Sequence, residues 1–315
     1  MIIMKYIRKV FRTHLSNNYV EHELRRVFDH LAVSATYIGE AIRDSARGLA
    51  GSRNQFGEQQ ATLDVLSDDI IRERLHQETS FRVRELASEE QGQIVKIEEN
   101  LGRYSVTVDP LDGSSLLDVN LSVGSIFGIH DGPLLDGRPG RQSLVAAMYI
   151  LYGPATTLVY TAGRGVHEFT LDSAGHWVLM QENIRMNDNG KIYAPGGRRS
   201  EWVPEHWQFI EDIEERGYTL RYSGALVADA NQILMKKGGV FSYPALQDKP
   251  EGKLRLLFEL QPLAMIFEQA GGAATDGQEH ILNLVPHRLD QRSSIYLGST
   301  MEVGLASEYL NSKSA

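Results

Sequence analysis

One segment, "VTVDPLDGSSLLDVNLSVGSIFGIH" (residues 106–130), constrains the fold of this chain more than any other. An apolar, β-branched strand runs into two aspartates, Asp109 and Asp112, and a second apolar strand follows a Gly-Ser-Ser turn. Pro110 restricts the backbone between the two acids, so that both carboxylates can converge on one point. Gly113 permits a positive φ angle or a close approach of the backbone. The segment therefore predicts two apolar strands joined by an acidic turn.

The composition of this turn is typical of a site for hard cations. Carboxylate and carbonyl oxygens suit Mg²⁺ or Mn²⁺, and Leu111 offers a carbonyl oxygen between the two aspartates. Ser114 and Ser115 add N–H and O–H donors for an anion. Glu89 and Glu90 follow a short upstream strand, and four acids gather if that strand lies beside the first strand of the segment. The alternative is an ordinary Asp-Gly turn with two solvated glutamates.

Periodicity divides the rest of the first half into helical and extended parts. Apolar residues at helical spacing predict a long amphipathic helix over residues 19–45. A polar, glycine-bearing loop is expected at 51–61, and a second helical pattern starts near Thr62 or Asp64. Residues from about 103 to 180 are rich in β-branched residues between Gly, Pro and Asp, which predicts a run of strands.

Predicted helices and strands alternate beyond about residue 190, with a helix over 254–270 and a strand at 281–285 among them. That alternation is typical of an α/β unit whose strands are covered by helices on both faces. We therefore predict an α/β protein with an α+β N-terminal half. A polar stretch near residue 190 predicts two domains, over 1–188 and 189–315.

Composition excludes several classes of protein. The 315 residues are 42% hydrophobic and 23% charged, as in a globular protein, and the net charge of −9 argues against a dedicated nucleic-acid binder. The absence of cysteine excludes disulfides, thiolate metal sites, cysteine nucleophiles and thiol-based redox control. The amino-terminal stretch lacks the apolar run of a signal peptide, and no window is long enough for a membrane span. We therefore expect a cytoplasmic enzyme without a membrane partner.

Six motifs, in order along nearly the whole chain, resemble those of the class I sugar bisphosphatases. This family contains the fructose-1,6-bisphosphatases and sedoheptulose-1,7-bisphosphatases, within a lithium-sensitive, magnesium-dependent phosphatase superfamily. The motifs are the acidic segment that begins "DPLDGSS", "NQFGEQQATLDVLSDD" (54–69), "SEE" (88–90), "YGPATTLVY" (152–160), "YTLRYSGALVAD" (218–229) and "EGKLRLLFELQPLAMIFEQAGG" (251–272). The "WDxAAG"-type motif of the related inositol-phosphatase branch is absent.

The resemblance implies a layered αβαβα fold, with a mixed N-terminal sheet beside two long helices and a mostly parallel C-terminal sheet. It implies a phosphoric monoester hydrolase that removes the 1-phosphate of fructose 1,6-bisphosphate by in-line attack of a metal-activated water, in gluconeogenesis or Calvin-type carbon fixation. Relatives are typically homotetramers. Two alternatives stay open: a sedoheptulose-1,7-bisphosphatase or dual-specificity enzyme, and a catalytically silent sugar-phosphate-binding protein.

The resemblance also implies roles for individual residues in a metal-binding N-terminal and a substrate-binding C-terminal domain. Two or three Mg²⁺ ions, replaceable by Mn²⁺ or Zn²⁺, would bind Glu89, Asp109, the Leu111 carbonyl, Asp112 and Glu259. The residues that orient and deprotonate the attacking water would be Glu90, Asp64 and the loop acid Glu58. Substrate would contact Asp112, Gly113, Ser114, Ser115, Arg221, Tyr222, Phe241, Ser242, Tyr243 and Lys253, with Arg221 reaching the site of a neighbouring subunit. Taken singly, Asp64 also suits a helix N-cap and Glu259 an exposed helix position.

Two departures from the family pattern concern specificity and regulation. Gly196 or Gly197 stands where fructose bisphosphatases carry an asparagine for the distal phosphate, and glycine N–H groups or Arg198 and Arg199 are the candidate replacements. Animal relatives are inhibited by AMP, and Arg103-Tyr104 matches part of their AMP site. His130-Asp131 replaces an arginine there, and an aspartate repels a nucleotide phosphate. We therefore predict weak or no inhibition by AMP.

Overall fold

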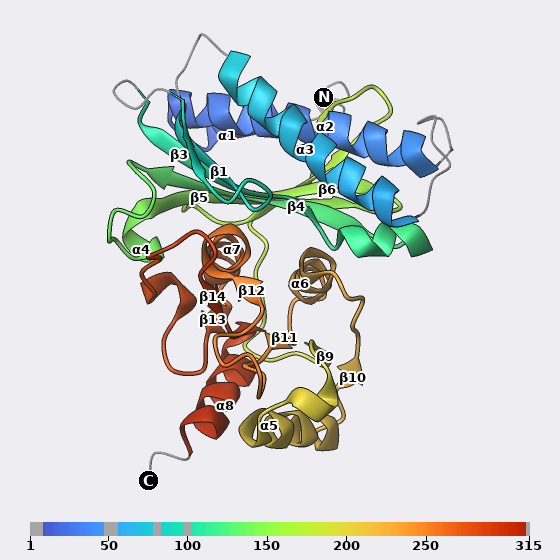
Figure 1. The fold of residues 1–315 in the computed structure, drawn as a ribbon, viewed down its shortest axis with the longest axis vertical. Helices are drawn as coiled ribbons and strands as arrows, with labels where there is room; N and C mark the ends of the chain where they lie inside the picture. The colour runs from blue at the N-terminus through green and yellow to red at the C-terminus, as the bar shows by residue number, and fades with distance from the viewer. Residues whose placement is uncertain (1–8, 47–55, 78–82, 98–101, 313–315) are drawn as a thin grey trace, which may run out of the picture.

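The structure is a computed structural model that describes residues 9–46, 56–77, 83–97 and 102–312. Its elements stack in five layers, in the order helix, sheet, helix, sheet, helix (Figure 1). The layered α/β fold expected from the family resemblance is therefore confirmed. Within the described residues, no helix is both long and apolar enough to cross a membrane.

The first two layers come from the N-terminal half. The outer helices are α1 (Phe11–Asn17), α2 (His22–Ala46) and α3 (Phe56–Gln77). They cover an eight-stranded sheet of β1 (Val83–Ser88), β2 (Ile94–Lys96), β3 (Tyr104–Asp112), β4 (Val123–Asp131), β5 (Leu144–Tyr152), β6 (Thr156–Thr161), β7 (His167–Leu171) and β8 (Trp177–Gln181). The order across the sheet is β2-β1-β3-β4-β5-β6-β7-β8. Among these strands β1 and β3 pair in parallel and the other neighbours pair antiparallel, so the sheet is mixed, as predicted.

Burial explains why these segments form these elements. The predicted helix over 19–45 is α2, whose residues Val27, Leu31, Ala35 and Ile38 recur at helical spacing and are fully buried. Strand β3 is buried along its entire length, and β4 is buried except at its last residue. Helices cover both faces of these central strands, which is why both strands are nearly continuous apolar runs (Figure 1).

The other three layers come from the C-terminal half. Helices α6 (Leu226–Met235) and α7 (Gln261–Gln269) lie between the two sheets, and α5 (Pro204–Glu215) and α8 (Thr300–Asn311) cover the far face. The second sheet has the order β10 (Thr219–Leu220), β9 (Ile192–Pro195), β11 (Val240–Tyr243), β15 (Ile295–Gly298) and β13 (Ala273–Thr275). Strand β15 is antiparallel to both neighbours, so two of the four strand pairings are parallel and the sheet is mixed rather than mostly parallel as predicted.

Short elements complete the chain and include the turns that carry the site. The β12–β14 ribbon lies apart from the two sheets. The remaining elements are β12 (Leu254–Arg255), β14 (Arg292–Ser293), α4 (Gly140–Ser143), the 3₁₀ turns η2 (Ser114–Val119), η3 (Arg199–Glu201) and η5 (Ile281–Asn283), and the π-helical turn η4 (Leu256–Leu260).

Three predicted elements differ from the structure. Helix α3 begins at Phe56, so Glu58 lies on a helix rather than in a loop, and Asp64 lies well inside that helix. The single helix predicted over 254–270 is instead β12, η4 and α7, because Pro262 sets the start of a new helix. The strand predicted at 281–285 contains the turn η5, whose buried apolar residues resemble a short strand in sequence.

Candidate active site

The acidic residues of the N-terminal half converge because β1 and β3 are parallel neighbours. The register pairs Ser88 with Val108, and the Glu89 N–H donates to the Val108 carbonyl at 2.9 Å. Glu89 therefore leaves β1 beside Asp109 at the end of β3. The adjacency of the two strands, which the sequence left conditional, is confirmed.

A third carboxylate reaches this point from the C-terminal half. One carboxylate oxygen each from Asp109, Asp112 and Glu259 lie within 4.8 Å of one another, and all three residues are buried. Glu259 lies on the π-helical turn η4, where its Oε2 accepts the backbone N–H of Arg255 at 2.6 Å. The Leu111 N–H donates to Asp109 Oδ1 at 3.1 Å, which fixes the turn between the two aspartates. The acidic cluster, defined as Glu89, Asp109, Asp112 and Glu259, thus lies between the two sheets.

Burial and mutual repulsion oppose negative charge in this cluster. Burial raises the pKa of Asp109 and of Glu259 well above their ordinary values, and the nearby Glu89 raises both further. Burial also raises the pKa of Asp112 to about 7, although the Val227 N–H bond to its Oδ2, at 2.7 Å, favours the charged form.

This cluster fits hard divalent cations. In the part of the chain that the structure describes, no ion pair joins Asp109, Asp112 or Glu259 to a basic side chain. Three buried carboxylates without such partners are costly unless cations neutralise them. The side-chain donors are all carboxylate oxygens, which suit Mg²⁺ or Mn²⁺ rather than soft metals.

A second pair of acids lies beside the cluster. Burial raises the pKa of Asp64 to about 6, the charge of Glu90 raises it further, and a hydrogen bond with Ser114 opposes the shift. The charges of Asp64 and Glu90 are therefore close enough to interact. Asp64 lies inside α3, so the N-cap alternative for this residue is excluded. Glu58 lies on the first turn of α3, and its side chain falls outside the described part of the structure.

A cavity of about 240 Å³ opens beside these acids. Its walls come from both halves of the chain and include Glu89, Asp112, Gly113, Ser114, Ser115, Tyr222, Gly224, Leu226, Phe241, Tyr243, Lys253, Leu254, Glu259 and Arg292. Two larger cavities, of about 570 and 1030 Å³, contain none of the predicted site residues. Of these three cavities, the smallest one is thus the one lined by predicted site residues.

The Asp-Gly-Ser-Ser turn takes its shape from the packing between the halves. Gly113 has φ 77°, and a Cβ added there would lie 2.4 Å from Cβ of Ala225. Glycine is therefore required both by the left-handed backbone and by the close approach of the C-terminal half. Ser114 and Ser115 follow as the first residues of η2 and line the cavity.

Four of the six substrate residues predicted in the C-terminal half line the wall that this half contributes to the cavity. Lys253 Nζ lies 5.5 Å from the centre of the Tyr243 ring, and Tyr222 remains 45% exposed. Ser242 is buried and does not line the cavity; its carbonyl accepts the Gly196 N–H at 2.7 Å. Arg221 is exposed and lies outside the cavity wall as the structure describes it.

Packing restricts the residues that could replace the asparagine with which fructose bisphosphatases bind the distal phosphate. A Cβ added at Gly196 would lie 2.2 Å from the Tyr243 ring, so no side chain fits there without a rearrangement. Arg198 pairs with Glu201 at 3.2 Å, and the Arg199 guanidinium stacks over Trp207 at 4.0 Å. Both arginines therefore have partners other than a ligand.

Sequence analysis missed two arginines in the site. Arg255 and Arg292 are directly opposite each other on the antiparallel β12–β14 ribbon. Arg255 Nη1 lies 2.8 Å from Glu89 Oε1, and Arg292 lines the cavity and donates to the Lys253 carbonyl. Arg255 follows Lys253 by two residues, the spacing that puts both on one face of a strand, and this signal was available. No local pattern points to Arg292.

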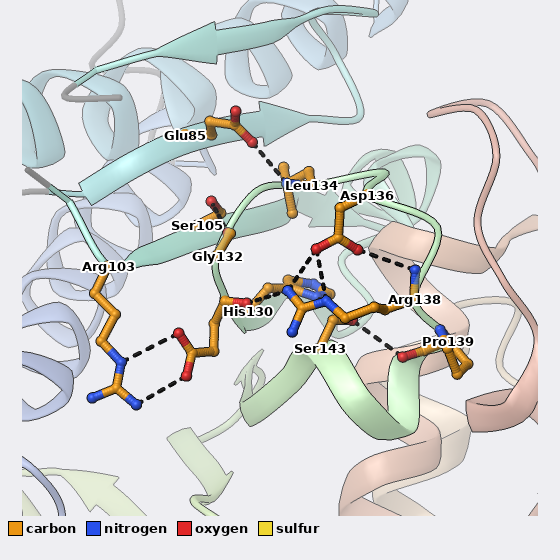
Figure 2. Close-up of polar contacts among 11 residues, drawn as sticks. Glu85, Arg103, Ser105, His130, Gly132, Leu134, Asp136, Arg138, Pro139 and Ser143 are labelled. Carbon is orange, nitrogen blue, oxygen red and sulfur yellow. Dashed lines mark hydrogen bonds and ion pairs between the residues drawn. The ribbon is translucent and has the colours of Figure 1, made fainter. Parts of the chain in front are cut away.

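At the opposite end of the β3–β4 pair, the residues that match the AMP site of animal relatives are paired with one another. Arg103 donates to both carboxylate oxygens of Asp131, at 3.2 and 2.9 Å (Figure 2). Arg103 also lies 2.9 Å from Glu21. The Tyr104 hydroxyl also donates to Glu21. His130 is buried between Thr107 and Ser143, and burial lowers its pKa to about 4, so it carries no positive charge near neutral pH.

The layered α/β fold and a buried cluster of carboxylates that suits hard cations are typical of a layered α/β phosphatase. Residues 7–182 match the family model "Fructose-1-6-bisphosphatase, N-terminal domain", and residues 186–311 match "Fructose-1-6-bisphosphatase, C-terminal domain". The chain belongs to the fructose-1,6-bisphosphatase family, whose members are metal-dependent.

Curated relatives and solved structures agree with this membership. The chain is 49% identical over 302 residues to the fructose-1,6-bisphosphatase class 1 of Trichlorobacter lovleyi, covering 96% of this chain and 95% of the relative. It is 48% identical over 300 residues to the enzyme of the same name from Geobacter sulfurreducens, covering 95% of each. The holo crystal structure of Leishmania major fructose-1,6-bisphosphatase superimposes with a TM-score of 0.87 at 34% identity, covering 96% of this chain and 98% of that one.

Proposed function

We propose that the acidic cluster and its cavity hydrolyse the 1-phosphate of fructose 1,6-bisphosphate, releasing fructose 6-phosphate and phosphate. The chain is a phosphoric monoester hydrolase of the fructose-1,6-bisphosphatase class. The observation that carries the assignment of the site is the convergence of Asp109, Asp112 and Glu259, whose oxygens lie within 4.8 Å of one another. A phosphate monoester resists attack because its oxygens are negative, and such a cluster binds the cations that remove this obstacle.

Two or three Mg²⁺ ions are proposed for this site, with Mn²⁺ or Zn²⁺ as substitutes. The carboxylates of Glu89, Asp109, Asp112 and Glu259 and the carbonyl of Leu111 would hold them. When bound, the ions would neutralise the phosphoryl oxygens, lower the pKa of the attacking water and stabilise the leaving alkoxide. Arg255 forms an ion pair with Glu89 and so already neutralises part of the negative charge of the acidic cluster.

Glu90 and Asp64 are proposed to orient the attacking water and accept its proton. The raised pKa of Asp64, about 6 because of burial, brings this carboxylate close to the range in which a general base works well at neutral pH. The water oxygen bonds to phosphorus in line with the phosphorus–O1 bond of the sugar, which breaks, and O1 leaves with a proton taken from solvent. Glu58 is assigned to the same step on the family resemblance alone.

Substrate contacts are proposed on both walls of the cavity. The N–H and O–H groups of Gly113, Ser114 and Ser115 would bind the phosphate that is cleaved, because they line the cavity next to Asp112. Tyr222, Tyr243 and Lys253 would bind the distal phosphate, and Phe241 and Asp112 would shape the sugar site. Ser242 is assigned to the sugar site on the family resemblance alone. Support for the first three is their place on the C-terminal cavity wall.

Assembly and domain organisation are also proposals. Arg221 is exposed and lies outside the cavity of its own chain, which fits a role in the site of a second copy within a homotetramer. Residues 1–188 and 189–315 are proposed as the metal-binding and substrate-binding domains. The cytoplasmic location expected from the sequence remains a prediction, as do the absence of nucleic-acid and membrane partners and the pathway.

Phosphate release from fructose 1,6-bisphosphate, measured with Mg²⁺ and with a chelator, tests this function. We expect hydrolysis that requires the metal and is lost in Asp109→Ala and Asp112→Ala variants. Activity in the chelator, or full activity in either variant, contradicts the mechanism. A protein that binds fructose 1,6-bisphosphate without releasing phosphate would instead be a sugar-phosphate-binding protein.

Sedoheptulose 1,7-bisphosphate is the second candidate substrate. The observation that favours it is the Gly196–Gly197 pair, since one of these glycines stands where fructose-specific relatives carry an asparagine and a Cβ at Gly196 would meet the Tyr243 ring. The longer sugar changes the distance between the two phosphates, so the distal wall decides the preference. Comparing kcat/KM on the two sugars settles it: a ratio near one indicates dual specificity, and a preference for sedoheptulose reverses the primary proposal.

A further inference from the structure

A buried aspartate without a role in the mechanism above lies on the first turn of α6. Asp229 is fully buried, and both of its oxygens accept backbone N–H groups from the segment that precedes the helix. Oδ1 accepts from Ser223 at 2.8 Å, and Oδ2 accepts from Gly224 at 3.4 Å. Two such bonds to one buried carboxylate restrict the backbone at Ser223 and Gly224, so Asp229 determines the conformation of this turn.

The turn that Asp229 holds is part of the cavity wall. Tyr222 and Gly224 both line the cavity. Gly224 has φ 101°, a conformation that other residues avoid, and a Cβ added there would lie 3.6 Å from the Leu116 side chain. The turn is therefore held in an unusual conformation close to η2, which follows the Gly113 turn.

The same helix end also binds the acidic cluster. Asp112 Oδ2 accepts the Val227 N–H at 2.7 Å, so the first turn of α6 lies between one carboxylate from β3 and one of its own. The backbones at Gly113 and Ala225 approach so closely that a Cβ at Gly113 would lie 2.4 Å from Cβ of Ala225. The first turn of α6 thus fixes the sugar side of the cavity relative to the phosphate side.

An ordinary helix cap does not account for this arrangement. A capping side chain accepts N–H groups from the first turn, or reaches back from that turn to the N–H of the N-cap residue, which is Ala225 here. Asp229 lies within the helix and accepts N–H groups from Ser223 and Gly224, which lie before it. Its bonds therefore order the turn that carries Tyr222 rather than the helix.

We propose that Asp229 is a positioning residue for the sugar bisphosphate, which holds the 222–225 turn in its binding conformation against the Asp112–Ser115 loop. The inference rests on the proposed function, because it assigns Tyr222 and this turn to substrate binding. In this scheme Asp229 contacts neither Glu90 and Asp64, which are proposed to orient the attacking water, nor the reacting phosphate. Its loss therefore weakens binding of the sugar more than it slows the chemical step.

The test uses Asp229→Asn in the full-length protein, with steady-state kinetics on fructose 1,6-bisphosphate and calorimetric binding of fructose 6-phosphate to the metal-free protein. The amide puts an NH₂ group where a backbone N–H now donates. We expect KM and the fructose 6-phosphate Kd to rise about tenfold, with kcat within about twofold of wild type. The matched control is Asp276→Asn, since Asp276 Oδ1 also accepts two backbone N–H groups, from Gln278 and Glu279 at 2.7 and 2.8 Å, but outside this cavity.

Gly224→Ala probes the same turn independently of Asp229, because its φ of 101° strains any side chain there. It should reproduce the rise in KM and keep the inference testable even where Asp229→Asn does not fold. Unchanged KM and Kd in both variants, or a loss confined to kcat, overturns the inference. Failure of the proposed function is a separate result, since the wild-type protein itself would then release no phosphate from fructose 1,6-bisphosphate.

Discussion

The β3–β4 pair carries a charged cluster at each end, and the two clusters differ in how their charges are balanced. At one end Arg103 is paired with Asp131 and Glu21, and all three side chains are substantially exposed. At the other end Asp109 and Asp112 join Glu259 in a buried group without basic ion-pair partners among the described residues. We call the first cluster balanced, because its two acids share a basic partner, and the second unbalanced, because its buried acids have no such partner among the described residues.

The difference separates structural charge from functional charge. Exposed, balanced ion pairs contribute about 0–1 kcal/mol each to folding, because water already solvates their members. Buried carboxylates that repel one another oppose folding, and burial raises the pKa of Asp109 and Glu259 accordingly. Such a group therefore serves a function other than stability. Its carboxylate oxygens suit the binding of cations.

Replacing one aspartate in each cluster should give the largest difference in activity between the two ends. Asp109→Asn removes a charge from the unbalanced cluster, and we expect kcat/KM on fructose 1,6-bisphosphate to fall by about a thousandfold or more, because cations lose a ligand. Asp131→Asn is the matched control and should keep kcat/KM within about twofold, because Asp131 pairs only with groups remote from the cavity. Comparable losses in both variants would remove the distinction between the two ends.

The pH dependence of stability in the metal-free protein should be the next largest effect. Burial raises the folded-state pKa of Asp112 from 3.8 to about 7, so the folded protein binds more protons than the unfolded chain between about pH 4 and pH 7. The stability that Asp112 contributes is present below this window and is lost as pH rises through it. Tm in a chelator should therefore fall across the window less in Asp112→Asn than in wild type.

Adding Mg²⁺ at the alkaline end of the window should restore Tm in the wild type, because a ligand that binds only the folded state stabilises it. Asp112→Asn should regain less. A pH dependence of Tm that is identical in wild type and variant, measured by differential scanning fluorimetry, would show that Asp112 is not the group in question.

Inhibition by AMP tests the balanced end. Asp131 and Glu21 already occupy Arg103, and the pKa of Asp131 lies below its ordinary value because Arg103 donates hydrogen bonds to it, so a carboxylate faces any incoming phosphate. We expect millimolar AMP to leave the initial rate of phosphate release unchanged. Complete inhibition by micromolar AMP would show that this network opens for a nucleotide.

The smallest effect is expected from removing the central cation of the balanced cluster. Arg103→Ala should lower the free energy of unfolding by about 1 kcal/mol or less, measured by urea denaturation, since the side chain is 50% exposed. A loss several times larger would mean that this network stabilises the fold as a buried group does.

Local patterns predicted much of the fold because periodicity and turn chemistry depend on neighbouring residues. The helix at 19–45, the strands on either side of the Asp112-Gly113 turn and most of the alternating C-terminal elements correspond to structural elements. The start of α3 and the break at Glu259 were not predicted, because a glycine-bearing polar stretch and a π-helical turn have no distinctive periodicity.

For the site, the sequence by itself determined which oxygen ligands exist and that two of them share one turn, since Asp109 and Asp112 are only three residues apart. Only the tertiary structure decided that Glu259 joins them and that Arg255 neutralises Glu89. The physical reason is that the backbone conformation is set largely by nearby residues, whereas charge balance and hydrogen-bond pairing depend on distance through space. Residues about 150 positions apart become neighbours only when two sheets enclose the helices between them.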